Sequence, residues 1–330
     1  MRAALLPAVR GKWEVKEVPT PVPGPNQVLI KIRASGLCYT DVHITEGTLP
    51  LPLQFPCILG HEPVGEIVAV GAGVTTRAIG DRVGVPWLQS SCGRCEWCQR
   101  GKAMFCANAT GTGIQLPGGH AEQMLAYAEA TALLPDSLSY DQAAPIFCAG
   151  YTVWSGLRLA EPQPHERIAV VGIGGLGHLA VQYAKAAGFE TIAVTRTKDK
   201  EQLVRDLGAD EVVPDGEALR AAGGADVILA TSNSMTSTGD TLKGLRPDGR
   251  LILMGLSSSD RLEVPADLLL TRGRIIGSQQ NGREYLYEAL DYAAKGKVKV
   301  IAETYPLKEI GRAYERVANG KVRFRAVITN

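Results

Sequence analysis

The stretch Arg167-Ile-Ala-Val-Val-Gly-Ile-Gly-Gly-Leu-Gly177 decides the fold of the second half of this chain. Five strand-forming residues run directly into a G-x-G-x-x-G pattern that opens a helical segment, the arrangement of a dinucleotide-binding turn. The first glycine makes the turn, the second admits the pyrophosphate, and the third lets the helix pack on the strand. The N-terminus of that helix offers free N–H groups to phosphate. A glycine-rich turn that binds no ligand is the alternative. The predicted cofactor contacts here are Gly172, Gly174, Gly175, Leu176 and Gly177.

Outward from this turn, strand and helix patterns alternate. The predicted strands cover residues 167–171, 191–194, 225–229 and 250–254, and the predicted helices cover 176–187 and 199–207. Such alternation is typical of a parallel, doubly wound α/β sheet. The last fifty residues add two helical stretches and a terminal strand over 324–328. The sequence therefore predicts a Rossmann-type domain from about residue 151.

The first third of the chain has a different texture, rich in Gly and Pro. Short β-branched runs at 28–33, 65–70 and 81–85 lie between turn residues, which predicts a β-rich, barrel-like domain. A length of 330 residues agrees with two domains.

Composition excludes several classes of protein. Lys+Arg number 35 and Asp+Glu 34, so the net charge of +1 gives no basic surface for nucleic acid or an anionic membrane. No apolar run is long enough to span a membrane, and the apolar stretch at the start is too short for a signal peptide. We expect a cytoplasmic protein with a small-molecule substrate.

Four of the seven cysteines lie in the fifteen residues Cys92-Gly-Arg-Cys-Glu-Trp-Cys-Gln-Arg-Gly-Lys-Ala-Met-Phe-Cys106. Thiolates at this spacing can surround one tetrahedral Zn²⁺, and four of them leave no open coordination position. Cys92, Cys95, Cys98 and Cys106 therefore predict a structural zinc site. A disulfide pair and an iron–sulfur cluster are the alternatives.

The second strand of the dinucleotide unit ends in Thr195-Arg196-Thr197-Lys198. An acidic residue usually holds the ribose hydroxyls at this position when the cofactor is NAD. Here no carboxylate repels a 2′-phosphate, and two cations can pair with one. The sequence predicts a preference for NADP(H) through Thr195, Arg196 and Lys198, the alternative being two solvated cations at a helix start.

A second metal site is suggested by Cys38, His61 and Cys148, which lie far apart in the sequence. Asp41 and Glu62 stand close to them in the chain and could act behind the ligands. Two cysteines and a histidine bind zinc with a fourth position open, but spacing alone does not group these residues, and an isolated cysteine is more often a core residue.

Four segments together resemble the zinc-dependent alcohol dehydrogenases of the medium-chain dehydrogenase/reductase superfamily. They are Gly60-His-Glu-Pro-Val-Gly65, the four-cysteine loop, Pro145-Ile-Phe-Cys-Ala-Gly150 and the glycine turn, in the family's order. The resemblance covers essentially the whole chain. It implies a GroES-like catalytic domain, residues 1–150 and 282–330, and a Rossmann domain, residues 151–281, with the active site in the cleft between them.

The resemblance also implies roles for individual residues. The family's catalytic zinc ligands correspond to Cys38, His61 and Cys148. The carboxylate beside the metal corresponds to Glu62, and the carboxylate that orients His61 corresponds to Asp41. The proton relay corresponds to Thr40 and His43. Trp87 resembles an aromatic residue of the substrate pocket, and Phe147 could be a second one. The residues that match nicotinamide contacts are Thr152, Met254 and Leu256. Arg325 matches a contact to the pyrophosphate. Tyr39, which we also assign to the substrate pocket, stands where relatives often carry Arg or His against the pyrophosphate, so a charge contact is lost or replaced by a hydroxyl. Thr195 departs from the family's usual Asp.

The function predicted is reversible hydride transfer between NADP(H) and a primary alcohol or aldehyde, with two zinc ions per subunit. A dehydrogenase of secondary alcohols, polyols or ketones is the alternative, and a non-catalytic nucleotide-binding protein is a third. Relatives of this kind are commonly homotetramers, with a homodimer as the alternative. We interpret Cys57 as a core thiol, with an oxidation-sensing role left open, and His120, His165 and His178 as packed or solvated residues.

Overall fold

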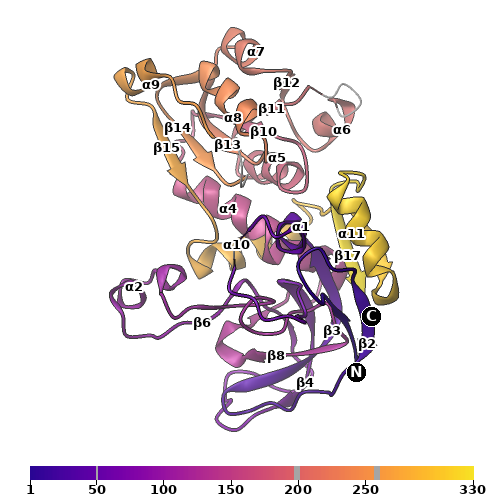
Figure 1. Ribbon diagram of the computed structural model, residues 1–330. Coiled ribbons are helices and arrows are strands. Elements are labelled where there is room, and N and C mark those ends of the chain that lie inside the picture. Colours follow the sequence, from indigo (N-terminus) through magenta and orange to yellow (C-terminus); the bar gives the residue numbers. More distant parts are fainter. Residues whose placement is uncertain (50, 197–200, 256–260) are drawn as a thin grey trace. The chain divides into compact units, whose positions relative to one another are not determined.

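The computed structural model describes residues 1–49, 51–196, 201–255 and 261–330 (Figure 1). The chain forms two compact units. Unit 1 comprises Met1–Cys148 together with Val300–Asn330, and unit 2 comprises Ala149–Lys299.

Unit 1 is built on a seven-stranded, mostly antiparallel sheet. Its order is β16-β17-β3-β4-β5-β9, and β8 also pairs with β3. These strands are β3 (Gln27–Leu37), β4 (Glu62–Val70), β5 (Arg82–Gly84), β8 (Gln123–Tyr127), β9 (Ala132–Leu133), β16 (Ala302–Pro306) and β17 (Arg325–Thr329). The predicted strands at 28–33, 65–70 and 81–85 correspond to β3, β4 and β5. Alternate residues of β3 and β4 enclose a core with Val28, Ile30, Ile32 and Ile67 at its centre.

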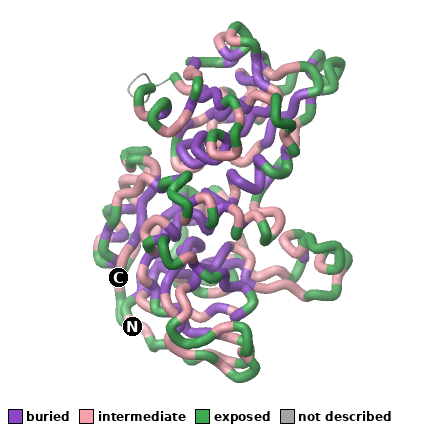
Figure 2. The backbone as a smooth tube through the Cα atoms, turned by 180° about the vertical axis from the view of Figure 1, so that it is seen from behind, coloured by how far each residue is buried: buried purple, intermediate pink, exposed green. Residues whose placement is uncertain are grey.

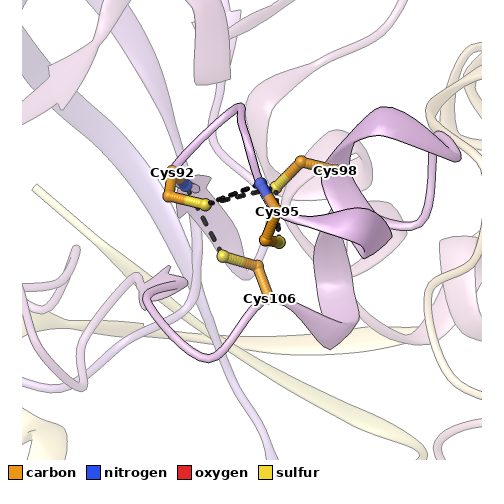
Figure 3. A group of neighbouring side chains, drawn as sticks. All are labelled: Cys92, Cys95, Cys98 and Cys106. Atoms are coloured by element: carbon orange, nitrogen blue, oxygen red, sulfur yellow. Dashed lines mark hydrogen bonds between the residues drawn. The ribbon is translucent and has the colours of Figure 1, made fainter.

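The remaining elements of unit 1 lie outside this sheet. They are β1 (Arg2–Leu5), β2 (Glu14–Glu17), β6 (Leu88–Ser90), β7 (Thr110–Gly111), α1 (Tyr39–Glu46), α2 (Glu96–Gln99), α3 (Tyr140–Ala143) and α11 (Ile310–Ala318). Strands β6 and β7 form a small ribbon whose connection, α2 and a 3₁₀ turn at Ala103–Phe105, carries the four clustered cysteines (Figure 3). We call residues 88–111 the cysteine lobe.

Unit 2 contains a six-stranded parallel sheet of order β12-β11-β10-β13-β14-β15. Its elements are α4 (Ala149–Leu159), β10 (Arg167–Val171), α5 (Gly177–Ala186), β11 (Glu190–Val194), α6 (Glu201–Asp206), β12 (Glu211–Val213), α7 (Gly216–Ala221), β13 (Ala225–Ala230), α8 (Met235–Thr241), β14 (Leu245–Leu253), α9 (Ala266–Leu270), β15 (Arg274–Gly277) and α10 (Arg283–Ala294). The order places the first strand centrally, which is the doubly wound arrangement that the alternation predicted.

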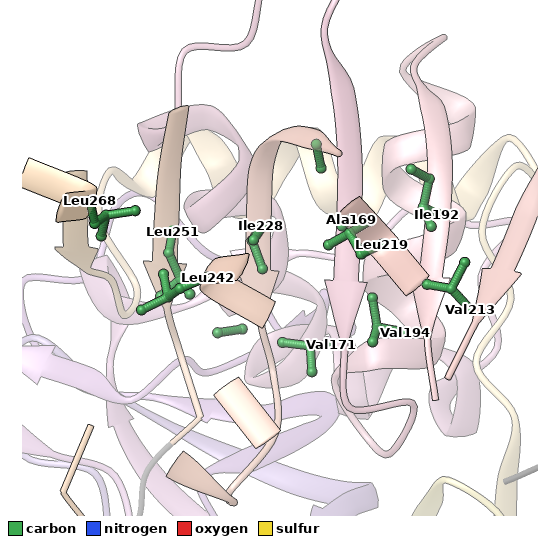
Figure 4. Close-up of a cluster of buried hydrophobic side chains, with 12 residues drawn as sticks. Ala169, Val171, Ile192, Val194, Val213, Leu219, Ile228, Leu242, Leu251 and Leu268 are labelled. Atoms are coloured by element: carbon green, nitrogen blue, oxygen red, sulfur yellow. The ribbon is translucent and has the colours of Figure 1, made fainter. Parts of the chain in front are cut away.

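Apolar side chains cover both faces of this sheet. Four of the five residues of β10 are buried, as expected for a central parallel strand. On one face, side chains of the strands pack against Leu219, Leu242 and Leu268 (Figure 4). Figure 2 shows buried residues in the interior of each unit, whereas the cysteine lobe is largely exposed or half-buried.

One boundary differs from the prediction. Residues 282–299 belong to unit 2 in the structure, although we had expected them with residues 1–150. The reason is that α10 packs against α4 and α5: Trp154 Nε1 donates to Glu288 Oε2 over 2.6 Å, and the Tyr183 hydroxyl donates to the Ala289 carbonyl over 3.0 Å. A helical pattern does not reveal which core its apolar face joins. Among the described helices, none has both the length and the apolar character needed to cross a lipid bilayer.

Candidate active site

Three segments of unit 1 bring Cys38, His61, Glu62 and Cys148 together. Cys38 lies between β3 and α1 as the N-cap residue of that helix, His61 and Glu62 lie at the start of β4, and Cys148 follows the 3₁₀ turn Ala144–Phe147. One donor atom of each residue lies within 4.8 Å of the donors of the other three. The fold therefore groups ligands that the sequence leaves dispersed.

The distances fit a tetrahedral zinc ion. Zn–S bonds of about 2.3 Å place two thiolates about 3.8 Å apart around one metal. The Cys38 and Cys148 sulfurs are 3.9 Å apart, and His61 Nε2 is 3.3 Å from Cys148 Sγ. Two cysteines and one histidine are the donor set of an open zinc site, so the residues present fit the metal that the sequence predicted.

Buried charge surrounds this cluster. The Arg325 guanidinium pairs with the Glu62 carboxylate, and both side chains are almost fully buried. Burial raises the pKa of Glu62 to about 7, although the Arg325 charge opposes the rise. The Cys148 thiol and the His61 ring hold the pKa of Cys38 well below its usual value, against the effect of burial. Burial lowers the pKa of His61, but the neighbouring Cys38 and the Asp41 and Glu62 carboxylates raise it to about 9.

The predicted orienting carboxylate, Asp41, lies behind the cluster. Its Oδ2 accepts a 2.8 Å hydrogen bond from the Cys38 backbone N–H, which fixes the first turn of α1. Its Oδ1 lies 4.0 Å from His61 Nδ1, about 1 Å beyond hydrogen-bond distance. The side of the His61 ring that faces away from Cys148 therefore faces Asp41.

The predicted proton relay begins at the cluster. Thr40 Oγ1 lies 3.6 Å from Cys38 Sγ. His43, one turn along α1, is half-buried, and its Nδ1 shares a 2.9 Å hydrogen bond with Thr48 Oγ1. The structure gives His43 a partner that the sequence analysis did not identify, Thr48.

The predicted pocket aromatics take different places. The Trp87 ring stands edge-on to His61 at a centroid distance of 5.2 Å. Tyr39 is exposed and stacks edge-on against His43. Phe147 is fully buried, and its ring occupies the space beside Gly84 where a Cβ would stand. The suggestion that Phe147 helps to form the substrate pocket is therefore wrong: it is a core residue.

The cysteine lobe forms the second cluster. The sulfurs of Cys92, Cys95, Cys98 and Cys106 lie within 4.8 Å of one another (Figure 3). Cys95 and Cys98 are 3.5 Å apart and Cys92 and Cys98 4.0 Å, again close to the spacing around zinc. Backbone N–H groups of Cys95 and Asn108 point to the sulfurs of Cys92 and Cys106. Four thiolates fill a tetrahedral shell, so this cluster has the donor set of a structural site.

The glycine turn of unit 2 has the geometry that its spacing predicted. Gly172 adopts a φ of +90°, and a Cβ there would lie 2.6 Å from Ser232 Cα. A Cβ on Gly174 would meet nothing within 4 Å, which leaves the turn open. A Cβ on Gly177 would lie 2.2 Å from the Gly172 carbonyl oxygen, so only glycine lets α5 begin this close to β10.

The other predicted cofactor residues lie on unit 2 as well. Thr195 follows β11 and Arg196 is exposed beside it. The Arg196 charge contributes to lowering the pKa of Asp240, after hydrogen bonds from Lys243 and the Gly216 N–H. Thr152 is half-buried on α4, and Met254 packs against Gly156 of the same helix. Lys198 and Leu256 lie outside the described residues.

Arg325 has a buried partner in unit 1. Its guanidinium pairs with Glu62 inside unit 1, a contact that the sequence analysis did not identify, and the pyrophosphate contact expected of Arg325 stays a prediction. The terminal strand β17 pairs with β3 in register, which brings Arg325 to the cluster beside Cys38. Sequence analysis missed this pairing because 263 residues separate the two partners.

Cys57 has little of the character of a redox sensor. Burial and the nearby Asp41 carboxylate raise the pKa of its thiol to about 11. Reactive cysteines instead have lowered pKa values and open access.

Comparison with known proteins agrees with this chemistry. The family model for the alcohol dehydrogenase GroES-like domain matches residues 24–136, and that for zinc-binding dehydrogenases matches residues 175–295. An alcohol dehydrogenase from Geobacillus stearothermophilus is 40% identical over 335 residues, 99% of each chain. The chain belongs to the zinc-dependent alcohol dehydrogenases of the medium-chain dehydrogenase/reductase superfamily.

Solved structures of this alcohol dehydrogenase family have the same fold. The acetophenone reductase from Geotrichum candidum, in complex with NAD, is 32% identical, with a TM-score of 0.88 over 100% of this chain and 97% of that one. CAD from Helicobacter pylori, in complex with NADP(H), is 27% identical, with a TM-score of 0.90 over 99% and 97%. The family thus assigns zinc, a nicotinamide cofactor and an alcohol substrate to this chain.

Proposed function

We propose that this alcohol dehydrogenase transfers hydride reversibly between NADP(H) and a primary alcohol or aldehyde, at a zinc ion held by Cys38, His61 and Cys148. The observation that carries the proposal is the convergence of these three donors and Glu62, within 4.8 Å, from three separate segments; Cys148 is half-buried and the others are buried. When bound, zinc at such a site supplies a Lewis acid that polarises an alcohol or carbonyl oxygen.

The surrounding residues transfer the proton, orient the ligands and form the substrate pocket. Thr40, whose hydroxyl lies 3.6 Å from Cys38 Sγ, takes the proton of the substrate hydroxyl. His43 passes that proton to solvent, with Thr48 fixing its ring through Nδ1. Asp41 orients His61, and Arg325 balances the charge of Glu62. Trp87, edge-on to His61, forms one wall of the substrate pocket, and Tyr39 lies at its mouth.

The cofactor binds on unit 2 in this proposal. The open turn at Gly174 and the N-terminus of α5 receive the pyrophosphate. Thr195 and Arg196, with Lys198, receive a 2′-phosphate, since Thr195 stands after β11 at the position where an acidic residue usually holds the ribose hydroxyls of NAD. Thr152, Met254 and Leu256 contact the nicotinamide. One similar solved structure contains NAD and another contains NADP(H), so overall similarity to these proteins does not indicate which cofactor this chain prefers.

A secondary alcohol or ketone substrate is the second candidate. The observation in its favour is the 32% identity to an acetophenone reductase across the whole chain. A non-catalytic nucleotide-binding role is disfavoured because every predicted ligand of the catalytic zinc is present and grouped.

The deciding experiment measures kcat/KM for matched primary alcohols, aldehydes, secondary alcohols and ketones with NADPH and NADH, and zinc per chain. We expect two zinc ions per chain, and the highest kcat/KM for an aldehyde with NADPH. A higher value for ketones would select the second candidate, and a protein with two zinc ions and no turnover would overturn both. Light scattering tests the proposed homotetramer against a homodimer, and cell fractionation tests the cytoplasmic location.

The cofactor preference has its own test. Arg196→Ala should raise the KM for NADPH by at least about tenfold and leave the KM for NADH nearly unchanged, because a charge-assisted contact to phosphate is lost. Arg205→Ala, a neighbouring exposed arginine that pairs with Glu201, is the matched control. Equal changes for both cofactors would contradict the assignment.

A further inference from the structure

His120 lies at the back of the catalytic cluster, fully buried in unit 1. Its Nε2 is 3.9 Å from Asp41 Oδ2, and Asp41 Oδ1 is in turn 4.0 Å from His61 Nδ1. The three side chains thus follow one another from the interior of the unit to a predicted ligand of the metal. We had interpreted His120 as a packed or solvated residue, and no spacing links it to Asp41.

The polar atoms of this row are unusually short of partners. Within the described part of the chain, neither ring nitrogen of His120 has a hydrogen-bond partner, and Asp41 Oδ1 has none. Burying a carboxylate or an imidazole without hydrogen bonds is costly, and most buried polar groups have a partner. The separations of 3.9 and 4.0 Å are each about 1 Å longer than a hydrogen bond, so small side-chain movements close both.

The backbone holds the two histidine segments together. The N–H groups of Gly118, Gly119 and His120 donate to the carbonyls of Ile58, Gly60 and Leu59 over 2.8, 2.8 and 3.0 Å. Gly60, next to His61, has a φ of +99°, and a Cβ there would lie 2.8 Å from His120 Nδ1. The His120 ring also meets the Trp13 ring edge-on, at a centroid distance of 5.7 Å. The ring is therefore in contact with both the His61 segment and Trp13.

We propose that His120 is a positioning residue that donates a hydrogen bond to Asp41 and so holds the carboxylate which orients His61. This inference rests on the proposed function, because it assumes that His61 binds the catalytic metal. Groups that fix a ligating histidine from behind tune metal affinity and activity by about 10- to 100-fold. The carboxylate keeps its bond from the Cys38 N–H, so Asp41 would link both ligands, Cys38 and His61, to His120.

Two substitutions separate positioning from packing. His120→Phe keeps a ring between Gly60 and Trp13 but removes the donor, whereas His120→Gln keeps a donor and loses the ring. A packing role predicts that Phe is the better replacement, and a positioning role predicts the reverse for metal retention. The readout is the zinc remaining per chain after timed exposure of the holoenzyme to EDTA, with melting temperature and kcat/KM measured alongside. A Cys38→Ala variant calibrates zinc loss from the cysteine lobe alone.

We expect His120→Phe to lose catalytic zinc about tenfold faster than the parent, with His120→Gln closer to the parent. In an Asp41→Asn background, His120→Phe should add little to the rate of zinc loss, because the carboxylate through which His120 acts on His61 is already absent. Equal zinc loss from all three proteins, an order that follows melting temperature, or full additivity with Asp41→Asn would overturn the inference. A parent protein with no zinc in this cluster would instead overturn the proposed function.

Discussion

The two cysteine clusters of unit 1 are opposites in construction. The cysteine lobe takes all four donors from fifteen consecutive residues, and its α2 helix has no buried residue. The catalytic cluster takes its donors from positions 38, 61, 62 and 148, and Cys38, His61 and Glu62 are buried. The first cluster is a local loop with the donor set of a closed metal site, whereas the second is a product of the sheet and its core. The difference teaches that local spacing identifies a closed metal site, while an open site depends on the whole domain.

The largest effect should come from the buried cluster. Cys38→Ala removes a ligand of the open site, so we expect a loss of one zinc per chain and a fall in kcat/KM of at least about 1000-fold. Binding of NADPH should change little, because the glycine turn belongs to unit 2. Zinc analysis, steady-state kinetics and cofactor titration check this. Full turnover by a zinc-depleted variant would contradict the mechanism.

The opposite pattern is expected in the lobe. Cys95→Ser should also remove one zinc per chain, but the loss should lower the melting temperature and expose residues 92–106 to proteases, because metal binding of roughly 10 kcal/mol can order such a loop. The kcat/KM per remaining zinc should stay close to the parent value. Calorimetry, limited proteolysis and kinetics measure this. Loss of turnover at unchanged stability would reverse the roles of the clusters.

Substitutions at two glycines, one beside each cluster, allow a direct comparison of how tightly the backbone is packed there. Gly60 has a φ of +99° and a Cβ there would lie 2.7 Å from the His120 backbone nitrogen, whereas Gly101 in the lobe has a φ of +71° and nothing within 4 Å. Gly101→Ala should therefore cost only the strained φ, about 1 kcal/mol of unfolding free energy. Gly60→Ala should cost more than about 2 kcal/mol and reduce catalytic zinc. Chemical denaturation and zinc analysis decide, and equal costs would show that the His61 segment is not tightly framed.

The smallest expected effect is a pH dependence of stability at Glu303, which belongs to neither cysteine cluster. Burial raises the pKa of Glu303, but hydrogen bonds from Tyr305, Arg316 and the Arg323 N–H outweigh it and lower the pKa to about 2. A lowered pKa stabilises the fold above the ordinary value of 4.5, and this stabilisation fades as the pH falls towards 2. Glu303→Gln should therefore be less stable than the parent at pH 6, with the gap in melting temperature narrowing by pH 3. A constant gap would point to lost packing instead.

Much of the fold could be predicted because its signals are local. The strand–glycine–helix turn at 167–177 and the alternation that follows predicted the parallel sheet, and β10 has the predicted bounds. The membership of α10 in unit 2 could not be predicted, because a helix's apolar face is visible in the sequence but its partner is not. Phe147 was misjudged for the same reason: an aromatic beside a ligand is equally compatible with pocket and core, and Gly84 decides the matter.

A closed four-thiolate site and a dinucleotide turn could be predicted from the sequence, since both are made of neighbours whose spacing specifies which atoms can meet. The tertiary structure decided the rest of unit 1's chemistry. Pairing of β3 with β4 and β17 brings Cys38, Glu62 and Arg325 together, and the backbone bonds of residues 58–60 to 118–120 set His120 behind Asp41. Buried polar groups acquire their partners from strands distant in sequence, and only the folded sheet specifies which strands those are.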